Sequence, residues 1–288
     1  MIVETPAKIN LTLEVLGRRT DGFHELATWM VPVGVFDRLE IVLGEKDEFT
    51  TDTPGLAWND HNLVYRAVGL FRQETGIRSL YRIRLTKRIP IGAGLAGGSS
   101  NAAATLRLLN RLHGEPFTDE ALIGLAARLG SDAAFFVRCE PAWCTGRGEK
   151  MAPRPFARGL WLLLVKPGFA VPTAAAYAAY AGLPAGERRG QPVATGWGEL
   201  RNDLEPAVFR KYVLLPLVKG WLARQPETTL SLMSGSGSTL FGLTAEAAQA
   251  DELQRRFVEN FGARFWIAVC PLNPAMPKAA GSGETQEW

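Results

Sequence analysis

Apolar and polar residues along the first half of the chain follow a pattern that predicts short strands and helices in turn. Segments 9–15 and 81–89 alternate between apolar and polar positions, which is typical of strands with one buried face. Segment 39–43 is a short apolar run of strand type. Helices are predicted at 65–75, 99–113 and 119–129, and each is followed by a glycine that can end it.

A short helix is also predicted after Gly130, with Ser131 as its cap and Asp132 in its first turn. A carboxylate at that position can simply stabilise its own helix through the helix dipole. It would also be well placed to accept a proton, and the two interpretations are compatible.

The second half predicts a different order of elements, after a change of composition at residues 151–158. That stretch, MAPRPFAR, has two prolines and no periodicity, so we expect a domain boundary there. The elements expected beyond it are strand 161–165, helix 173–181, helix 204–223, strands 229–233 and 238–243, helix 245–261 and strand 264–269. Apart from the extra helix at 204–223, this is the β-α-β-β-α-β order of a ferredoxin-like sandwich.

These elements predict an α+β protein of two domains, 1–152 and 153–272, followed by a loose tail at 273–288. Segment 184–198 is rich in glycine, proline and polar residues and is expected to be a loop. A chain of 288 residues, 47% of them hydrophobic, is long enough to form two cores.

Charge and cysteine content narrow the functional classes. The net charge of +3 and a pI near 8.8, with no Lys/Arg run interleaved with aromatics, favour a small anionic substrate and argue against nucleic-acid binding. Three cysteines without CxxC spacing suggest neither disulfides nor a zinc site. The N-terminus has no signal-peptide pattern and no apolar run is long enough to span a membrane, so we expect a cytoplasmic protein without membrane association.

The segment PIGAGLAGGSSNAA, residues 90–103, predicts phosphate binding. It resembles a Walker loop, but Gly98 stands where that motif has lysine. Its GxGxxG pattern would also suit a dinucleotide site, yet the strand before it is amphipathic and the nearest acid, Asp119, begins a different helix. Glycines before a helix N-terminus still allow backbone amides to approach phosphate. Which residue supplies the positive charge is left open by the loop itself.

Three segments together resemble the motifs of the GHMP small-molecule kinases: PAKINLTLEVLGRRTDGFHEL at 6–26, the glycine loop, and SLMSGSGSTLFGL at 231–243. LGSDAAFFV at 129–137 stands where that family keeps its catalytic aspartate. The resemblance covers roughly residues 5–270. It implies an N-terminal domain of the ribosomal-protein-S5-domain-2-like fold, a ferredoxin-like C-terminal domain, and ATP-dependent phosphorylation of a small molecule.

The resemblance also implies site residues. Lys8 and Asp132 would be catalytic, with Lys8 supplying the charge that the loop lacks. Residues implied to hold ATP are Asn62, Lys87, Pro90, Gly92, Ala93, Gly94, Leu95, Ala96, Gly97, Gly98, Ser99 and Ser100. Ser99 and Ser100 would lie near Mg²⁺. The opening segment is most similar to family members that act on a cytidine diphosphate derivative, which implies substrate contacts from Asn10, Phe23, His24, Thr173 and Tyr177.

Alternatives remain for several of these assignments. Lys8 could be a surface lysine beside a strand, and Tyr177 could be a core residue of an alanine-rich helix. Phe23 stands where such kinases usually have tyrosine, so it keeps the stacking face and loses the hydroxyl. A GHMP kinase of the homoserine or mevalonate type, or a nucleotide-binding module without catalysis, are the competing functions.

Overall fold

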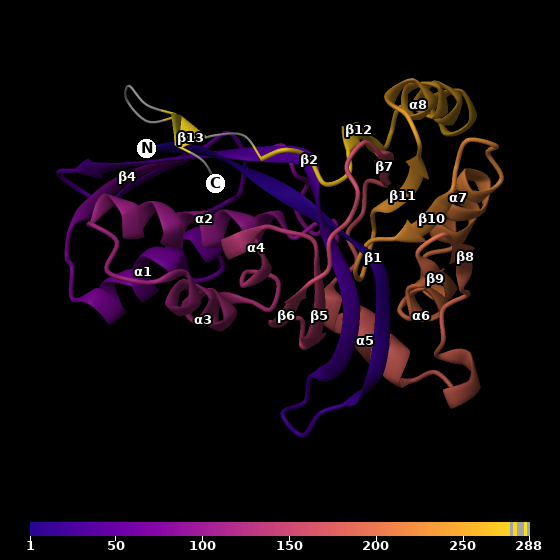
Figure 1. Cartoon of the computed structure of the whole chain (residues 1–288), viewed down its shortest axis with the longest axis horizontal. Coiled ribbons are helices and arrows are strands. Elements are labelled where there is room, and N and C mark those ends of the chain that lie inside the picture. Colours follow the sequence, from indigo (N-terminus) through magenta and orange to yellow (C-terminus); the bar gives the residue numbers. More distant parts are fainter. Residues whose placement is uncertain (277–278, 281–284, 287–288) are drawn as a thin grey trace.

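The computed structural model describes residues 1–276, 279–280 and 285–286, which form a large mixed sheet and a smaller antiparallel sheet with helices packed against them (Figure 1). The first sheet has the strand order β14-β13-β1-β2-β4-β3, and β5 and β6 continue it from β2. Its strands are β1 (Ile2–Arg18), β2 (His24–Gly44), β3 (Glu48–Thr51), β4 (Leu80–Thr86), β5 (Ala142–Gly146), β6 (Lys150–Pro153), β13 (Ala279–Ala280) and β14 (Thr285–Gln286).

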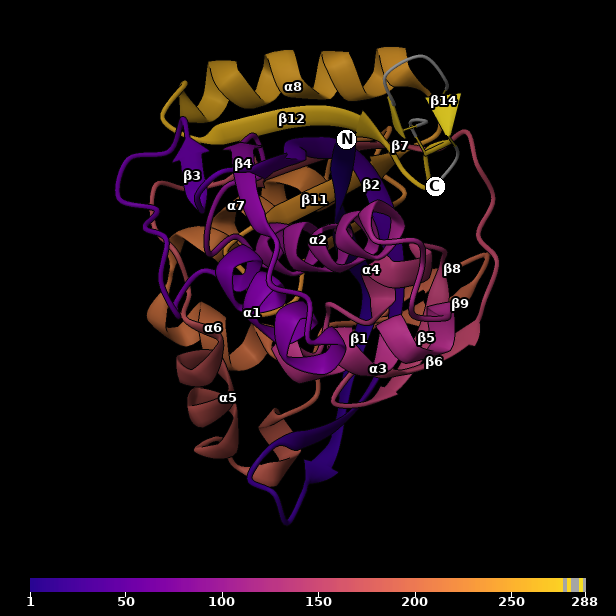
Figure 2. The same ribbon diagram turned by 90° about the vertical axis from the view of Figure 1, so that its left-hand side faces the viewer.

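The hairpin of β1 and β2 has the longest strands of this sheet. It runs between the two halves of the molecule, and its tip projects at the bottom of both views (Figures 1 and 2). Apolar residues of β1 contribute to each of three hydrophobic clusters in turn, through Val3, Ile9 and Leu13. The prediction of a strand with only one buried face over 9–15 is wrong for its central part. Asn10 and Thr12, on the polar face, are buried as well, because segments from the C-terminal half cover them.

Helices α1 (Leu63–Thr75), α2 (Gly97–Leu112) and α3 (Asp119–Leu129) confirm the three predicted helices and pack against the first sheet (Figure 2). The short helix α4 (Phe135–Arg138) begins later than predicted. Ser131 and Asp132 lie in the turns before it, since Ala133 N bonds to Gly130 O and Phe136 N to Ala133 O, three residues back. Asp132 is therefore not a residue of the first helical turn.

The second sheet confirms the ferredoxin-like order. Its strands β7 (Trp161–Lys166), β10 (Leu230–Met233), β11 (Leu240–Thr244) and β12 (Trp266–Pro271) form an antiparallel sheet in the order β10-β11-β7-β12. Helix α5 (Thr173–Ala181) follows β7, and α8 (Ala247–Phe261) joins β11 to β12. The buried side chains of α8 and of the sheet form one cluster with those of α5.

The single helix predicted at 204–223 is wrong. The structure has two, α6 (Glu205–Lys211) and α7 (Leu214–Ala223), with a break at Tyr212. Pro216 explains the break, because a proline ring clashes with the carbonyl four residues earlier, here that of Tyr212.

The loop predicted at 184–198 is also more ordered than expected. It contains a 3₁₀ turn at Ala185–Glu187 and β8 (Val193–Thr195), which pairs with β9 (Gly198–Leu200).

The predicted domain boundary lies between β6, a strand of the first sheet, and β7, a strand of the second sheet. The division at residue 152 stays a prediction. The tail expected at 273–288 lies partly outside the described residues, and Ala280 pairs with Ile2. No helix in the described part of the chain is long and apolar enough to cross a membrane.

The buried face of α8 predicts a large difference between two leucine substitutions. Leu253 is completely buried between α8 and the second sheet, whereas Leu217 on α7 is 63% exposed. Leu253→Ala should lower the free energy of unfolding by about 2–5 kcal/mol. Leu217→Ala should change it by less than about 0.5 kcal/mol. Urea unfolding followed by circular dichroism checks both, and equal midpoints for the two variants would contradict this packing.

Candidate active site

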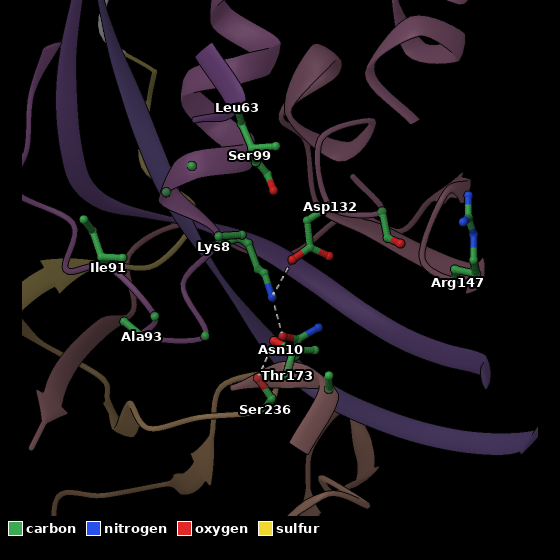
Figure 3. A pocket seen from close by; sticks show the side chains of 18 of the residues that line it. Lys8, Asn10, Leu63, Ile91, Ala93, Ser99, Asp132, Arg147, Thr173 and Ser236 are labelled. Carbon is green, nitrogen blue, oxygen red and sulfur yellow. Dashed lines mark hydrogen bonds and ion pairs between the residues drawn. The ribbon is translucent and has the colours of Figure 1, made fainter. Parts of the chain in front are cut away.

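One cavity of about 1070 Å³ collects almost all of the predicted site residues. Its walls come from β1, β2, the glycine loop before α2, the start of α1, the turn before α4, the start of α5 and the turn at 235–236. Figure 3 shows the side chains that point into it. Both halves of the chain are needed to enclose this space.

Lys8 lies at the centre of the cavity with only 3% of its surface exposed. Its Nζ donates a 2.7 Å hydrogen bond to Asn10 Oδ1 and lies 3.4 Å from Asp132 Oδ2 (Figure 3). The Asn10 amide is held in turn by the Thr28 hydroxyl at 2.7 Å. The Asp132 side chain remains 31% exposed toward the cavity. This arrangement fixes a positive charge and leaves the carboxylate beside it open to a ligand.

The glycine loop approaches this pair through its backbone. The Lys8 amide donates to Leu95 O at 3.1 Å, and the Ser234 hydroxyl donates to Gly94 O at 3.0 Å. Gly94 has a φ of +77°, and a Cβ there would lie 2.2 Å from Ser234 O, so no side chain fits. Ala96, also in the left-handed region, precedes α2. The first backbone N–H groups of a helix have no partners inside it, which suits them to phosphate.

The other residues predicted to hold the nucleotide or metal are placed differently. Ser99 lines the cavity, whereas Ser100 is buried away from it and its Oγ has no hydrogen-bond partner among the described residues. Asn62 and Lys87 line the cavity, but their polar atoms bond to other residues of the protein. Asn62 caps α1 by accepting from Val64 N at 2.9 Å, and Lys87 pairs with the buried Asp37. Pro90, Gly92, Ala93, Gly97 and Gly98 also line the cavity, whereas Leu95 does not.

The far end of the cavity is aromatic. The His24 ring stacks on Tyr177 with 4.9 Å between centroids and 21° between planes. Phe23 is 51% exposed, and the Arg147 guanidinium lies 4.8 Å from its ring centroid. Thr173, at the start of α5, shares a 3.1 Å hydrogen bond with the Ser236 hydroxyl. The two rings expected beside a base therefore have different neighbours: Tyr177 packs on His24, and Phe23 on Arg147.

Ionisation in this aromatic end follows from burial and from nearby charges. Burial raises the pKa of the Tyr177 hydroxyl above its ordinary value, so this group stays neutral. Burial, together with the positive charges of Arg18 and Arg188, lowers the pKa of His24. A neutral imidazole can both donate and accept a hydrogen bond.

Sequence reasoning missed several residues that shape the site. Thr28 orients Asn10, Arg147 covers Phe23, and Ser236 meets Thr173. Asp37 accepts from the amides of Arg88 and Ile89 at 2.7 and 2.8 Å and so anchors the segment that leads into the loop. A charged residue at the end of the apolar run 29–36 of β2 was the available signal for Asp37. Ser236 lies within the motif at 231–243, whereas Thr28 and Arg147 carry no local signal, because their partners are distant in the sequence.

Comparison with known proteins shows the family of this chain. Residues 62–140 match the family model described as the GHMP kinases N terminal domain. A 4-diphosphocytidyl-2-C-methyl-D-erythritol kinase of Methylacidiphilum infernorum is 45% identical over 252 residues, which cover 83% of this chain and 84% of that protein. This chain belongs to the 4-diphosphocytidyl-2-C-methyl-D-erythritol kinase family. The same-named kinase of Desulfitobacterium hafniense is 39% identical and covers 86% and 88% of the two chains.

Solved structures support the family and the fold. A crystal structure of a 4-(cytidine 5'-diphospho)-2C-methyl-D-erythritol kinase is 33% identical, with a TM-score of 0.76 over 95% of this chain and all of that one. A homoserine kinase from Cytophaga hutchinsonii is 18% identical, with a TM-score of 0.66 over 93% of each chain, and shares the fold alone. The expected two-part GHMP kinase fold is thus confirmed for this kinase family member.

The charges around His24 predict how its pKa responds to mutation. Arg18→Gln removes a positive charge that disfavours the imidazolium, so the His24 pKa should rise. Arg255→Gln, on the exposed face of α8, should leave it unchanged. NMR titration of the imidazole C–H signals measures both. Since folding disfavours the protonated ring, His24 also contributes stability that is lost as pH falls through its folded pKa. An unchanged His24 titration midpoint in Arg18→Gln would contradict this electrostatic assignment.

Proposed function

We propose that this protein transfers the γ-phosphoryl group of ATP to the 2-hydroxyl of 4-diphosphocytidyl-2-C-methyl-D-erythritol, in the non-mevalonate pathway to isoprenoid precursors. The observation that carries the proposal is that one cavity brings three groups together. They are the glycine loop, the Lys8–Asp132 pair and the His24–Tyr177 stack. Family membership supports the same activity.

ATP would place its phosphates along residues 92–99. The glycines let a ligand approach the backbone closely, and the start of α2 offers N–H groups to anionic oxygens. Lys8 would add the positive charge that the loop sequence lacks. Because Lys8 is hydrogen-bonded to Asn10 and ion-paired with Asp132, its ammonium is already in position when charge develops on the transferred group.

Asp132 would accept the proton of the attacking hydroxyl. Its carboxylate is the only acidic group among the described residues that line the cavity. Lys8 Nζ, 3.4 Å from Oδ2, orients this carboxylate. Phosphoryl transfer depends mainly on positioning and on charge stabilisation, which is what this pair supplies.

The acceptor would bind with its cytosine at the aromatic end. Tyr177 and His24 offer ring faces for stacking, and neutral His24 can pair with polar atoms on the edge of a base. Arg147 and Arg18 also line the cavity and carry charge that suits a diphosphate. Arg147 lies on the opposite side of Lys8 from Ile91 and Ala93 of the glycine loop (Figure 3), which leaves the Lys8–Asp132 pair between the two ligands.

Mg²⁺ would be held mainly by ATP. No group of three or more His, Cys, Asp or Glu side chains in the described part of the chain can hold a metal. Mg²⁺ commonly takes one or two protein oxygens and completes its shell with phosphates and water. The Ser99 hydroxyl fits that role, and the ion would neutralise phosphate charge. We place the reaction in the cytoplasm, which is consistent with three buried free cysteines.

The substrate assignment predicts selectivity for cytosine. With ATP and Mg²⁺, the cytidine diphosphate derivative of methylerythritol should yield ADP and a phosphorylated product, whereas homoserine and mevalonate should not. The uridine diphosphate analogue should react with kcat/KM lower by roughly tenfold or more, because a mismatched base edge leaves polar groups unpaired. A coupled ADP assay with mass spectrometry of the product measures this. Equal kcat/KM for the two bases would show that the pocket does not read cytosine.

The proposed proton acceptor predicts a specific kinetic defect. Asp132→Asn should lower kcat by at least about a hundredfold while both substrates still bind, because the amide cannot take the proton. Lys8→Met should have a similar effect through loss of charge stabilisation. Asp119→Asn, on the exposed first turn of α3, is the matched control and should retain full activity. Near-normal turnover in folded Asp132→Asn would mean that another group accepts the proton.

A further inference from the structure

The turn formed by Ser234–Gly237 is wedged between the glycine loop and Lys8. A Cβ built on Gly235, whose φ is +57°, would lie 3.3 Å from Gly94 O, 3.4 Å from Asn10 Oδ1 and 3.6 Å from Lys8 Nζ. Gly235 and Ser236 both line the cavity. The position of this turn therefore determines how much room remains around the Lys8 ammonium.

Asn202 holds the turn from the side away from the cavity. Its Nδ2 donates to Met233 O at 2.7 Å and to Gly235 O at 2.8 Å, while its Oδ1 accepts from Leu204 N at 2.9 Å. Only 1% of its surface is exposed, and it does not line the cavity. Both the NH₂ group and the oxygen of the Asn202 amide are therefore hydrogen-bonded to the backbone.

The segment that carries Asn202 is itself fixed to β1. Leu13 N donates to Arg201 O, and Asp203 N donates to Leu13 O, both at 2.8 Å. The Asp203 carboxylate also accepts from Val15 N at 2.9 Å. Asn202 thus links the turn to β1, the strand that carries Lys8. Hydrogen bonds from the turn to Asn202, and from its neighbours to Leu13, therefore define the separation between the turn and the ammonium.

We infer that Asn202 is a positioning residue for the phosphoryl transfer proposed above, acting through Gly235 and Ser236. It touches neither ligand region, so its loss should not remove a binding contact. A shift of the turn would instead move Lys8 and Asn10 relative to the glycine loop. Displacements of about 1 Å at reacting groups can cost about a hundredfold in rate.

The test replaces Asn202 by aspartate, which has the same shape but faces two carbonyls with an acceptor. Asn202→Ala, which removes both donors without adding charge, is the second variant. We expect kcat to fall by roughly tenfold to a hundredfold, with KM for ATP and for the cytidine substrate within about threefold of wild type. Amide hydrogen exchange across residues 234–239 should become at least about tenfold faster.

The matched control is Asn110→Asp. Asn110 is also buried and clamps a backbone segment, through 2.9 Å bonds to the carbonyl and amide of Phe117, far from the cavity. This variant should lose stability without the kcat defect and without faster exchange at 234–239. If wild-type protein is inactive on the cytidine substrate, the proposed function fails, whereas the exchange measurement still tests the link to the turn.

Three results would overturn the inference itself. One is unchanged kcat in folded Asn202 variants of an active enzyme, and another is a kcat loss of the same size in Asn110→Asp. The third is unaltered exchange at 234–239. If Asn202→Asp does not fold, Asn202→Ala decides by the same measurements.

Discussion

The buried ammonium of Lys8 is the constraint on which the arrangement of the site depends. A charge with 3% of its surface exposed is stable only when polar partners replace the water it has lost. Asn10 and Asp132 provide them, and Asn10 in turn requires Thr28. Each partner comes from a different part of the chain, so the need to compensate one charge draws β1, β2 and the turn before α4 together. The glycine loop then meets the same strand through the Lys8 amide.

Local signals in the sequence were sufficient for much of the fold. Helices α3 and α5 have the predicted bounds, because a capping threonine, a following glycine or a preceding proline marks their ends. The order of elements in the second half also followed from periodicity. The break between α6 and α7 was missed although Pro216 is visible in the sequence, since an apolar helical pattern continues on both sides of it.

The parts that could not be predicted depend on contacts between distant residues. Strand β5 pairs with β2 and β6 with β5, and the β8–β9 hairpin lies in a polar segment with no clear alternation. The motifs identified Lys8 and Asp132 as a possible pair, and the structure brings them together. Burial of Lys8, in contrast, could not be read from a strand whose neighbouring positions alternate. The packing of His24 on Tyr177, and of Arg147 on Phe23, likewise arises only after folding.

The path of β1 has a consequence for how the protein is made. Residues near the start of the chain bond to segments that emerge from the ribosome much later: Thr12 donates to Arg201 O, 189 positions away. Proteins rich in such long-range contacts fold slowly, because distant segments must meet before the contacts stabilise them. A nascent chain that ends before residue 236 has Lys8 but not the turn that covers it. The polar face of β1 therefore stays uncovered until the segment that contains this turn has been synthesised.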